Sequence, residues 1–222
     1  MKLLLSLFLI FSLSTACFSA DPEGRVNKKL ENCATVIQEL LDMPEDGIPA
    51  DLLDQCTGIA IFPNTIKGGF ILGGRGGTGV VLSHDKETGE WSAPAFVGIG
   101  GISFGFQIGA QASDIVLVTT SRKGLDMLLR HNVTLGVDAA VAAGPVGRNA
   151  EISTDILLQT PILSYSRTKG AFIGVALDGA VIAQDKKDNK TLYGKPLTAI
   201  EIVIDKKVSP TPEGKKLINA LN

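Results

Sequence analysis

The sequence predicts an α+β fold: a single glycine-rich domain of mostly antiparallel, twisted sheets, built from two repeated β-units with flanking helices. Three observations lead to this prediction. Apolar residues recur at helical spacing near the start of the chain. Short apolar runs bounded by turn residues fill its middle. A motif of the first half returns 102 residues later.

The first twenty residues have the layout of a secretory signal peptide. Lys2 precedes an apolar run from Leu3 to Leu13, which is too short to span a bilayer, and small residues follow. Two cleavage sites compete. Residues 14–17 (Ser-Thr-Ala-Cys) resemble a bacterial lipobox, in which Cys17 is lipidated, whereas a cut after Ala20 leaves a bulky residue close to the cut. We expect export, to the periplasm or to a membrane as a lipoprotein anchored through Cys17.

The composition beyond the leader limits the partners. Of 21 basic residues 20 lie there, together with all 23 acidic residues, so the formal charge of this part is −3. A slightly acidic chain with two histidines argues against nucleic acid, which favours a basic surface. Cys33 and Cys56 can pair in an oxidising compartment or remain buried free thiols, and their spacing does not decide between the two.

The chain divides into four segments. We assign residues 1–20 to the signal peptide, 21–57 to N-terminal helices, 58–204 to the β-rich domain and 205–222 to a C-terminal tail. From Val26 to Leu41 apolar residues recur at steps of three and four, which predicts an amphipathic helix. Its basic start suits a membrane surface, but interspersed acidic residues favour packing against a core.

Short elements follow this helix. A second helix is expected from Pro49 to Cys56. The expected strands are Ile59–Phe62, Lys67–Leu72, Val80–Ser83 and Asp114–Thr120. Turns are expected at Pro63-Asn64 and at Lys86–Gly89, and the glycines of residues 74–79 are expected to form a bend between twisted strands.

The stretch from Trp91 to Ser113 contains no charged residue, so a membrane span has to be considered. Apolar and small polar residues alternate from Ile102 to Gln111, however, and a period of two predicts a strand with one apolar face. Ser121 is then expected to cap a helix that reaches about His131. A further helix near 196–203 and a loose tail complete the chain.

A motif of the first half of the sequence returns in the second half. Residues 67–71 (Lys-Gly-Gly-Phe-Ile) return as residues 169–173 (Lys-Gly-Ala-Phe-Ile), and Trp91 corresponds to Tyr193 in the same register. We infer a duplicated β-unit arranged about a pseudo-two-fold axis. The alternative is chance similarity between strands rich in glycine and valine.

Two motifs suggest enzymes, and both lack the required context. Residues 74–79 fit the dinucleotide fingerprint, but a strand follows where a helix is needed. Ser103 lies in a G-x-S-x-G motif, with Asp114 or Asp126 and then His131 in the order used by hydrolases, yet it falls inside the alternating strand. No cluster in the sequence has metal-ligand spacing. We therefore expect that the protein is not an enzyme and that it binds no cofactor and no metal. A hydrolase that uses Ser103 ranks third among the functions considered, after lipid binding and binding of a partner protein.

Several motifs in order, from about Leu52 to Ile204, resemble the SYLF domain family. They are Gly58–Pro63, Lys67–Phe70, Gly76–Val80, Trp91–Pro94, Gln107–Ala110, Val133–Gly136, Ala143–Glu151, Tyr165–Gly170 and Tyr193-Gly194. The resemblance implies binding of anionic phospholipids, with phosphoinositides among the ligands of eukaryotic members, some of which also associate with actin. Because an exported protein would not meet actin, we expect no actin partner.

Five basic residues lie beside glycines or in expected turns, where backbone amides and a cation can cradle a phosphate headgroup. They are Lys67, Arg75, Arg148, Arg167 and Lys169. Each can equally be a solvated turn residue, and Arg148 can form an ion pair with Glu151. The leading hypothesis is an exported protein that binds anionic phospholipid at a membrane surface. The alternative is a structural envelope protein that holds a partner protein through its glycine-rich strands.

Overall fold

One curled sheet organises the molecule. The computed structural model describes residues 21–43, 47–70, 72–104, 109–147, 160–168 and 171–222. The strands are β1 (Gly58–Phe70), β2 (Leu72–Ser83), β3 (Ala95–Phe104), β4 (Gly109–Thr119), β5 (Asn132–Thr134), β6 (Val141–Ala143), β7 (Ile162–Thr168), β8 (Ala171–Gly174) and β9 (Val181–Gln184). Their order is β5-β9-β3-β2-β1-β4-β7-β6, with β8 paired to β7. The β6–β7 pair is parallel and the others are antiparallel.

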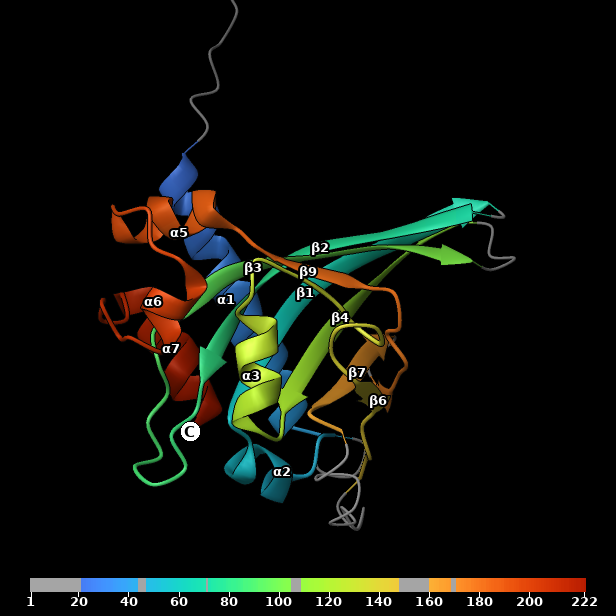
Figure 1. The fold of residues 1–222 in the computed structure, drawn as a ribbon, viewed down its shortest axis with the longest axis horizontal. Helices are drawn as coiled ribbons and strands as arrows, with labels where there is room; N and C mark the ends of the chain where they lie inside the picture. Colours follow the sequence, from blue (N-terminus) through green and yellow to red (C-terminus); the bar gives the residue numbers. More distant parts are fainter. Residues whose placement is uncertain (1–20, 44–46, 71, 105–108, 148–159, 169–170) are drawn as a thin grey trace, which may run out of the picture.

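Helices cover both faces of this sheet. They are α1 (Pro22–Leu41), α2 (Ala50–Gln55), α3 (Arg122–Leu128), α5 (Lys186–Tyr193), α6 (Ala199–Val203) and α7 (Pro212–Leu221). In Figure 1, α3 lies in front of the curled sheet and α1 behind it. The expected α+β class, with a mostly antiparallel sheet and flanking helices, is confirmed. No helix among the described residues is long and apolar enough to cross a membrane.

The two sheet faces bury separate apolar cores. We call the face that packs on α1 and α7 the α1 face; it carries Ile61, Val80, Phe96 and Val116. The opposite face, the α3 face, packs on α3 and α6 and carries Ala60, Val81, Val97 and Leu117. Alternate residues of one strand serve opposite cores because successive side chains of a strand point to opposite faces.

Helix α1 confirms the core-packing interpretation of the N-terminal segment. Asp21 caps it by accepting hydrogen bonds from the amides of Glu23 and Gly24, and Pro22 occupies its first turn. The expected apolar residues from Val26 to Leu40 are buried, whereas Leu41 is 45% exposed and does not belong to this face. The short helix after Pro49 and the Ser121-capped helix are also confirmed, although α3 ends at Leu128.

The expected turn at Pro63-Asn64 is wrong. β1 runs through it as one strand, and the register with both neighbours shifts there, as in a β-bulge. Asn64 takes a positive φ of 48°, and its amide donates a 2.9 Å hydrogen bond to Asp114 Oδ1. Turn-forming residues thus bend the strand without ending it. Likewise the glycines of residues 74–79 lie within β2 and form no bend between strands.

The alternating run from Ile102 to Gln111 is not a single strand. It contains the end of β3 and the start of β4, and residues 105–108 between them lie outside the described part. These strands are separated in the sheet by β2 and β1. The period of two was read correctly as β-structure, but it continues through the connection between two strands and therefore hides it.

The inferred duplication is also wrong for the described strands. Phe70 ends the long strand β1, which pairs with β2 along most of its length, whereas Phe172 belongs to the short outer strand β8. β8 lies beside β7, and β9 lies at the other side of the sheet beside β3. At the offset of 102 residues, the turn segment before Trp91 corresponds to α5. Because α5 is a helix, the two segments are not superposable.

Three local expectations about helices and cysteines also need correction or remain open. A helix, α5, occupies the segment that the inferred duplication matched to the turn at Lys86–Gly89. Another helix, α7, occupies the expected loose tail, with Thr211 as its cap and Pro212 in its first turn. Cys33 and Cys56 are both buried free thiols, so they do not form a disulfide. The expected signal peptide and Cys17 lie outside the described residues.

Candidate functional site

Four strands extend beyond the rest of the sheet. β9 pairs with β3 only as far as Gly100, and β7 pairs with β4 only from Asp114 onward. Beyond those points β3, β2, β1 and β4 continue as a four-stranded extension, which Figure 1 shows projecting from the body. We call it the arm and define it as residues 66–70, 72–76, 100–104 and 109–112. The remaining described residues are the body.

The arm carries two of the expected lipid-binding residues as a direct pair. Lys67 on β1 lies opposite Arg75 on β2 in the register, so both belong to the α3 face. Directly opposed residues of an antiparallel pair have Cβ atoms about 5 Å apart. On the outer sides of the pair, Lys67 faces Gln111 of β4 and Arg75 faces Gly101 of β3, and neither residue is charged.

The charge of this pair is not neutralised by the described chain. Neither side chain forms a hydrogen bond or an ion pair with a described residue. The sequence from 66 to 76 and from 100 to 112 contains no other charged residue. Partial burial of Arg75 lowers its pKa because water is withdrawn from the charged guanidinium. Since like charges directly opposed destabilise a sheet, the pair is suited to an anion from outside.

Arg167 occupies a different environment from the arm cations. It lies on β7, and Nε and Nη2 donate to Asp114 Oδ2 at 2.8 and 2.6 Å. A second ion pair joins it to Glu39 of α1, and its guanidinium lies 5.5 Å from the ring centre of Phe172. The side chain is 16% exposed. Arg167 therefore ties α1 to the sheet, and this engagement leaves it less suited to a headgroup than the arm pair.

Arg148 and Lys169, the other two expected lipid ligands, lie outside the described residues, so their roles stay predictions. Ser103 lies within β3 and not at a strand-to-helix turn, so the geometry of a nucleophile elbow is not formed. Asp114, one of its expected partners, accepts hydrogen bonds from Arg167. Among the described residues no group of three or more His, Cys, Asp or Glu side chains is placed to hold a metal ion.

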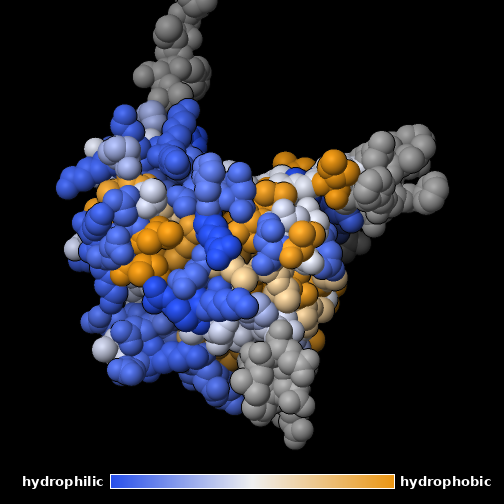
Figure 2. All heavy atoms as spheres, viewed as in Figure 1, coloured by the Kyte–Doolittle hydropathy of each residue, from blue (hydrophilic) through white to orange (hydrophobic). Residues whose placement is uncertain are grey.

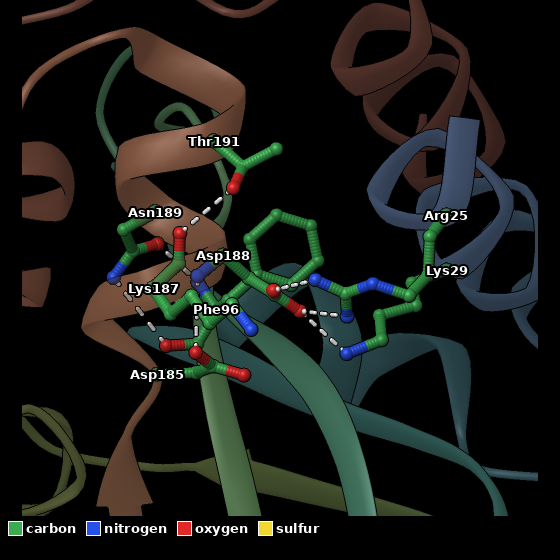
Figure 3. A network of polar contacts seen from close by, with 8 residues as sticks. All are labelled: Arg25, Lys29, Phe96, Asp185, Lys187, Asp188, Asn189 and Thr191. Atoms are coloured by element: carbon green, nitrogen blue, oxygen red, sulfur yellow. Dashed lines mark hydrogen bonds and ion pairs between the residues drawn. The ribbon is translucent and has the colours of Figure 1, made fainter. Parts of the chain in front are cut away.

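A second polar cluster, which no sequence pattern indicated, joins α1 to α5. Figure 3 shows Arg25 and Lys29 converging on the carboxylate of Asp188. The Asp188 side chain is 1% exposed. Burial alone would raise its pKa, but hydrogen bonds from the two cations outweigh burial and hold the pKa below its ordinary value. Asn189 beside it accepts a 2.7 Å hydrogen bond from the Phe96 amide.

This cluster bears on the alternative interpretation of α1 as an amphipathic helix that lies on a membrane surface. Arg25 and Lys29, two of the three basic residues at its start, are engaged by Asp188, and the third, Lys28, pairs with Glu31. Basic residues near the start of α1 were visible in the sequence. Their acidic partner was not identifiable, because the inferred duplication matched its segment to the turn at Lys86–Gly89.

A pocket in the body provides a contrast to the arm. Its volume is about 390 Å³, and its charged and ionisable lining residues are His84, Asp85, Lys86, Glu87, Arg122 and Lys206. Asp85 already accepts hydrogen bonds from the turn amides, and Arg122 pairs with Asp126. Because the lining mixes both signs, the pocket has no clear preference for an anion.

Comparisons with known proteins give a consistent family. Residues 100–222, more than half of the chain, match the profile of the Ysc84 family, described as "Las17-binding protein actin regulator". The SH3 domain-containing YSC84-like protein 1 of Xenopus laevis is 34% identical over 181 residues, which cover 81% of this chain and 53% of that protein. The Rattus norvegicus protein of the same name is 30% identical over 205 residues, covering 90% and 59%.

A fungal protein is also similar to this chain. The LAS seventeen-binding protein 3 of Saccharomyces cerevisiae is 31% identical over 177 residues, covering 78% of this chain and 38% of that protein. The chain thus spans between about two-fifths and three-fifths of the length of these relatives.

Proposed function

We propose that this chain binds anionic phospholipid headgroups at a membrane surface without catalysing a reaction. The chain belongs to the Ysc84 family, also called the SYLF-domain family. One observation supports the proposal above the others. Lys67 and Arg75 are directly opposed on neighbouring strands, and no described residue neutralises them.

The two side chains complement each other as phosphate ligands. A guanidinium presents a planar fork that matches two phosphate oxygens, whereas an ammonium acts as a compact point charge. A headgroup with more than one phosphate, such as that of a phosphorylated phosphatidylinositol, can use both. Singly charged headgroups can be shared between them. We therefore include phosphoinositides among the proposed ligands and expect general anionic lipids to compete.

The attraction is local, since the chain as a whole carries a formal charge of −2. Each basic side chain near an anionic bilayer contributes about 1 kcal/mol, and this contribution decays over a Debye length of about 8 Å at physiological salt. Two cations therefore give weak binding that depends on salt. Firm attachment requires either apolar contact with the bilayer or a covalent lipid.

Vesicle flotation tests the proposal. Binding is expected to rise with the fraction of anionic lipid and to weaken as salt increases. The Lys67→Glu/Arg75→Glu double variant is expected to lose most of this binding and to keep its melting temperature. Lys216→Glu on α7 is the control, because it reverses an exposed cation of the body. Equal binding to neutral and anionic vesicles at low and high salt would contradict the proposal.

A partner protein is the second candidate. The family description names Las17 binding and actin regulation, and in the arm the outer edges of β3 and β4 have no neighbouring strand among the described residues. Such edges can accept an added strand. Co-sedimentation with filamentous actin, and pull-down with Las17, would detect this activity. Loss of either interaction in the double variant would assign it to the arm.

Export remains part of the proposal, and the expected absence of an actin partner depends on it. We propose that residues 1–20 direct export and that Cys17 carries a lipid anchor. Incorporation of radiolabelled palmitate into the wild type but not into Cys17→Ser is the expected result. A wild-type chain that keeps its first residues and stays in the cytoplasm would contradict export and restore actin as a candidate.

A further inference from the structure

The arm has a second face, which has a different composition. On its α1 face, one cross-strand row places Ile66 of β1 beside Gly76 of β2 and Gly100 of β3. The next row places Gly68 beside Gly74 and Ile102. The glycines of β2 therefore form a flat strip between two isoleucines. Because neighbouring strands lie about 4.8 Å apart, the strands that carry the isoleucines are about 10 Å apart.

The chain itself does not require glycine in this strip. A Cβ added at Gly74 or at Gly76 would have no atom within 4 Å, and neither residue has a positive φ. Glycine in a strand interior weakens the strand, and it commonly marks a place where a ligand or another surface approaches the backbone closely. The described residues supply no such surface, so we look for one outside the chain.

The exposed apolar side chains indicate the kind of surface. Ile66 is 58% exposed and Ile102 is 71% exposed, among the highest values for large apolar residues in the described chain. Figure 2, which views the molecule from the side of α3, shows apolar residues also among the described residues of the arm. The described α1 face of the arm has no charged residue, and the arm's two charges, Lys67 and Arg75, are both positive. An occupant has to be apolar, flat and accompanied by negative charge.

An anionic bilayer meets these three requirements, and we infer that the arm enters its interface with the α1 face of the arm against the acyl chains. Ile66 and Ile102 are then buried in lipid, and Lys67 and Arg75 extend from the opposite face to the phosphate level, as long basic side chains do at interfaces. The inference rests on the proposed lipid binding and adds which surface enters the membrane. It supplies the apolar contact that two cations alone lack.

Fluorescence of a tryptophan placed on the arm tests the insertion directly. The only native tryptophan, Trp91, is 9% exposed in the body and is replaced by phenylalanine. Ile102→Trp in this background reports on the arm. Ile200→Trp is the matched control, because Ile200 is an exposed isoleucine of α6 in the body. The probes are vesicles of anionic lipid, with and without bromine on the acyl chains.

The expected result is a blue shift of Ile102→Trp emission on binding and strong quenching by the brominated chains, with Ile200→Trp unaffected. Binding of both variants without quenching of Ile102→Trp would overturn the insertion and leave headgroup binding intact. Absence of binding by both variants and by the wild type would overturn the proposed function and the insertion together. A blue shift that grows with protein concentration without vesicles would assign this face to a second copy and overturn the inference.

Partitioning of a charged variant provides an independent check. Ile102→Asp is expected to lower the vesicle partition coefficient by about tenfold or more, since burial of one isoleucine contributes at least that much. Ile102→Leu is expected to bind as the wild type does, and Ile200→Asp should also bind normally. An unchanged melting temperature for Ile102→Asp separates loss of binding from loss of fold. Unchanged partitioning of Ile102→Asp would overturn the inference.

Discussion

The glycines of β2 serve two different purposes along one strand. At Gly79, in the body, an added Cβ would lie 1.9 Å from the carbonyl oxygen of Ile61, so the neighbouring backbone excludes any side chain. Gly144 is constrained in the same way by the ring of Tyr165, 2.0 Å from its added Cβ. At Gly74 and Gly76, in the arm, there is no such neighbour. Gly79 and Gly144 of the body are thus required for internal packing, whereas Gly74 and Gly76 of the arm are not.

The cations of the body and of the arm also differ in whether they have a partner in the chain. Arg167 in the body holds Asp114 and Glu39, and Arg25 and Lys29 hold Asp188. Lys67 and Arg75 in the arm have no described partner. These body cations are paired within the chain, whereas the two arm cations and the open strip at Gly74 and Gly76 have no described neighbour that engages them. This difference indicates that the composition of the arm is suited to something outside the chain.

The largest effect expected of a single substitution is on Arg167. Arg167→Ala leaves Asp114 and Glu39 without their cation where the sheet meets α1, and breaking a largely buried pair in this way costs about 3 kcal/mol of unfolding free energy. Lys67→Ala, in the arm, is expected to change stability by less than about 0.5 kcal/mol. Urea unfolding of both variants measures the difference. Equal effects of the two substitutions would remove the distinction between body and arm cations.

A pair of glycine substitutions in β2 tests the steric half of the comparison. Gly79→Ala forces the new Cβ against backbone and is expected to destabilise the fold by about 1–3 kcal/mol. Gly76→Ala meets no atom and removes backbone freedom from the unfolded chain, so it is expected to stabilise by about 0.5 kcal/mol. Thermal unfolding of both variants is the measurement. A destabilising Gly76→Ala would mean that the arm also needs its glycines for folding.

Acid should weaken the body through Asp188. Its pKa in the folded chain is lowered from an unfolded value of about 3.9, so its contribution to stability is fully present above that pH and is lost as pH falls through the folded value. Asp188→Asn is expected to cost about 2 kcal/mol at pH 7, because charged hydrogen bonds are lost. That cost should shrink below about pH 4. A cost independent of pH would show that the carboxylate charge is not what stabilises the cluster.

The smallest expected effect concerns the two cysteines of the body. Burial raises the pKa of Cys56 to about 12 and that of Cys33 further, so both thiols stay protonated and unreactive in the folded protein. A reductant is expected to leave the melting temperature unchanged, and a thiol reagent should label both residues only after unfolding. Labelling of the folded chain at the rate of a free peptide thiol would contradict their burial.

Local sequence signals predicted several helices of the body correctly. The steps of three and four in α1 and the capping serine of α3 were readable because burial of one helix face and satisfaction of the first amides depend on nearby residues. The error at Pro63-Asn64 has the same physical root. A bulge and a turn use the same residue types, and only pairing with β2 and β4 distinguishes them.

Long-range pairing accounts for the remaining errors and for the site. The sequence suggested Lys67 and Arg75 separately, and only the register of β1 with β2 makes them a pair. Ile66 and Ile102 were not singled out, because their exposure depends on where α1, β7 and β9 end. The misassigned repeat shows the same limit, since matching letters at a fixed offset carry no information about which strands pair.

Hydrogen–deuterium exchange with and without anionic vesicles tests the central claim most directly, because it reports on arm and body in one experiment. The account predicts slower exchange in peptides covering residues 66–76 and 100–112 when vesicles are bound. Peptides from α1 and from the Asp188 cluster should exchange as in the free protein. Protection confined to α1, with unchanged exchange in both arm segments, would contradict the account and assign the membrane contact to the N-terminal helix.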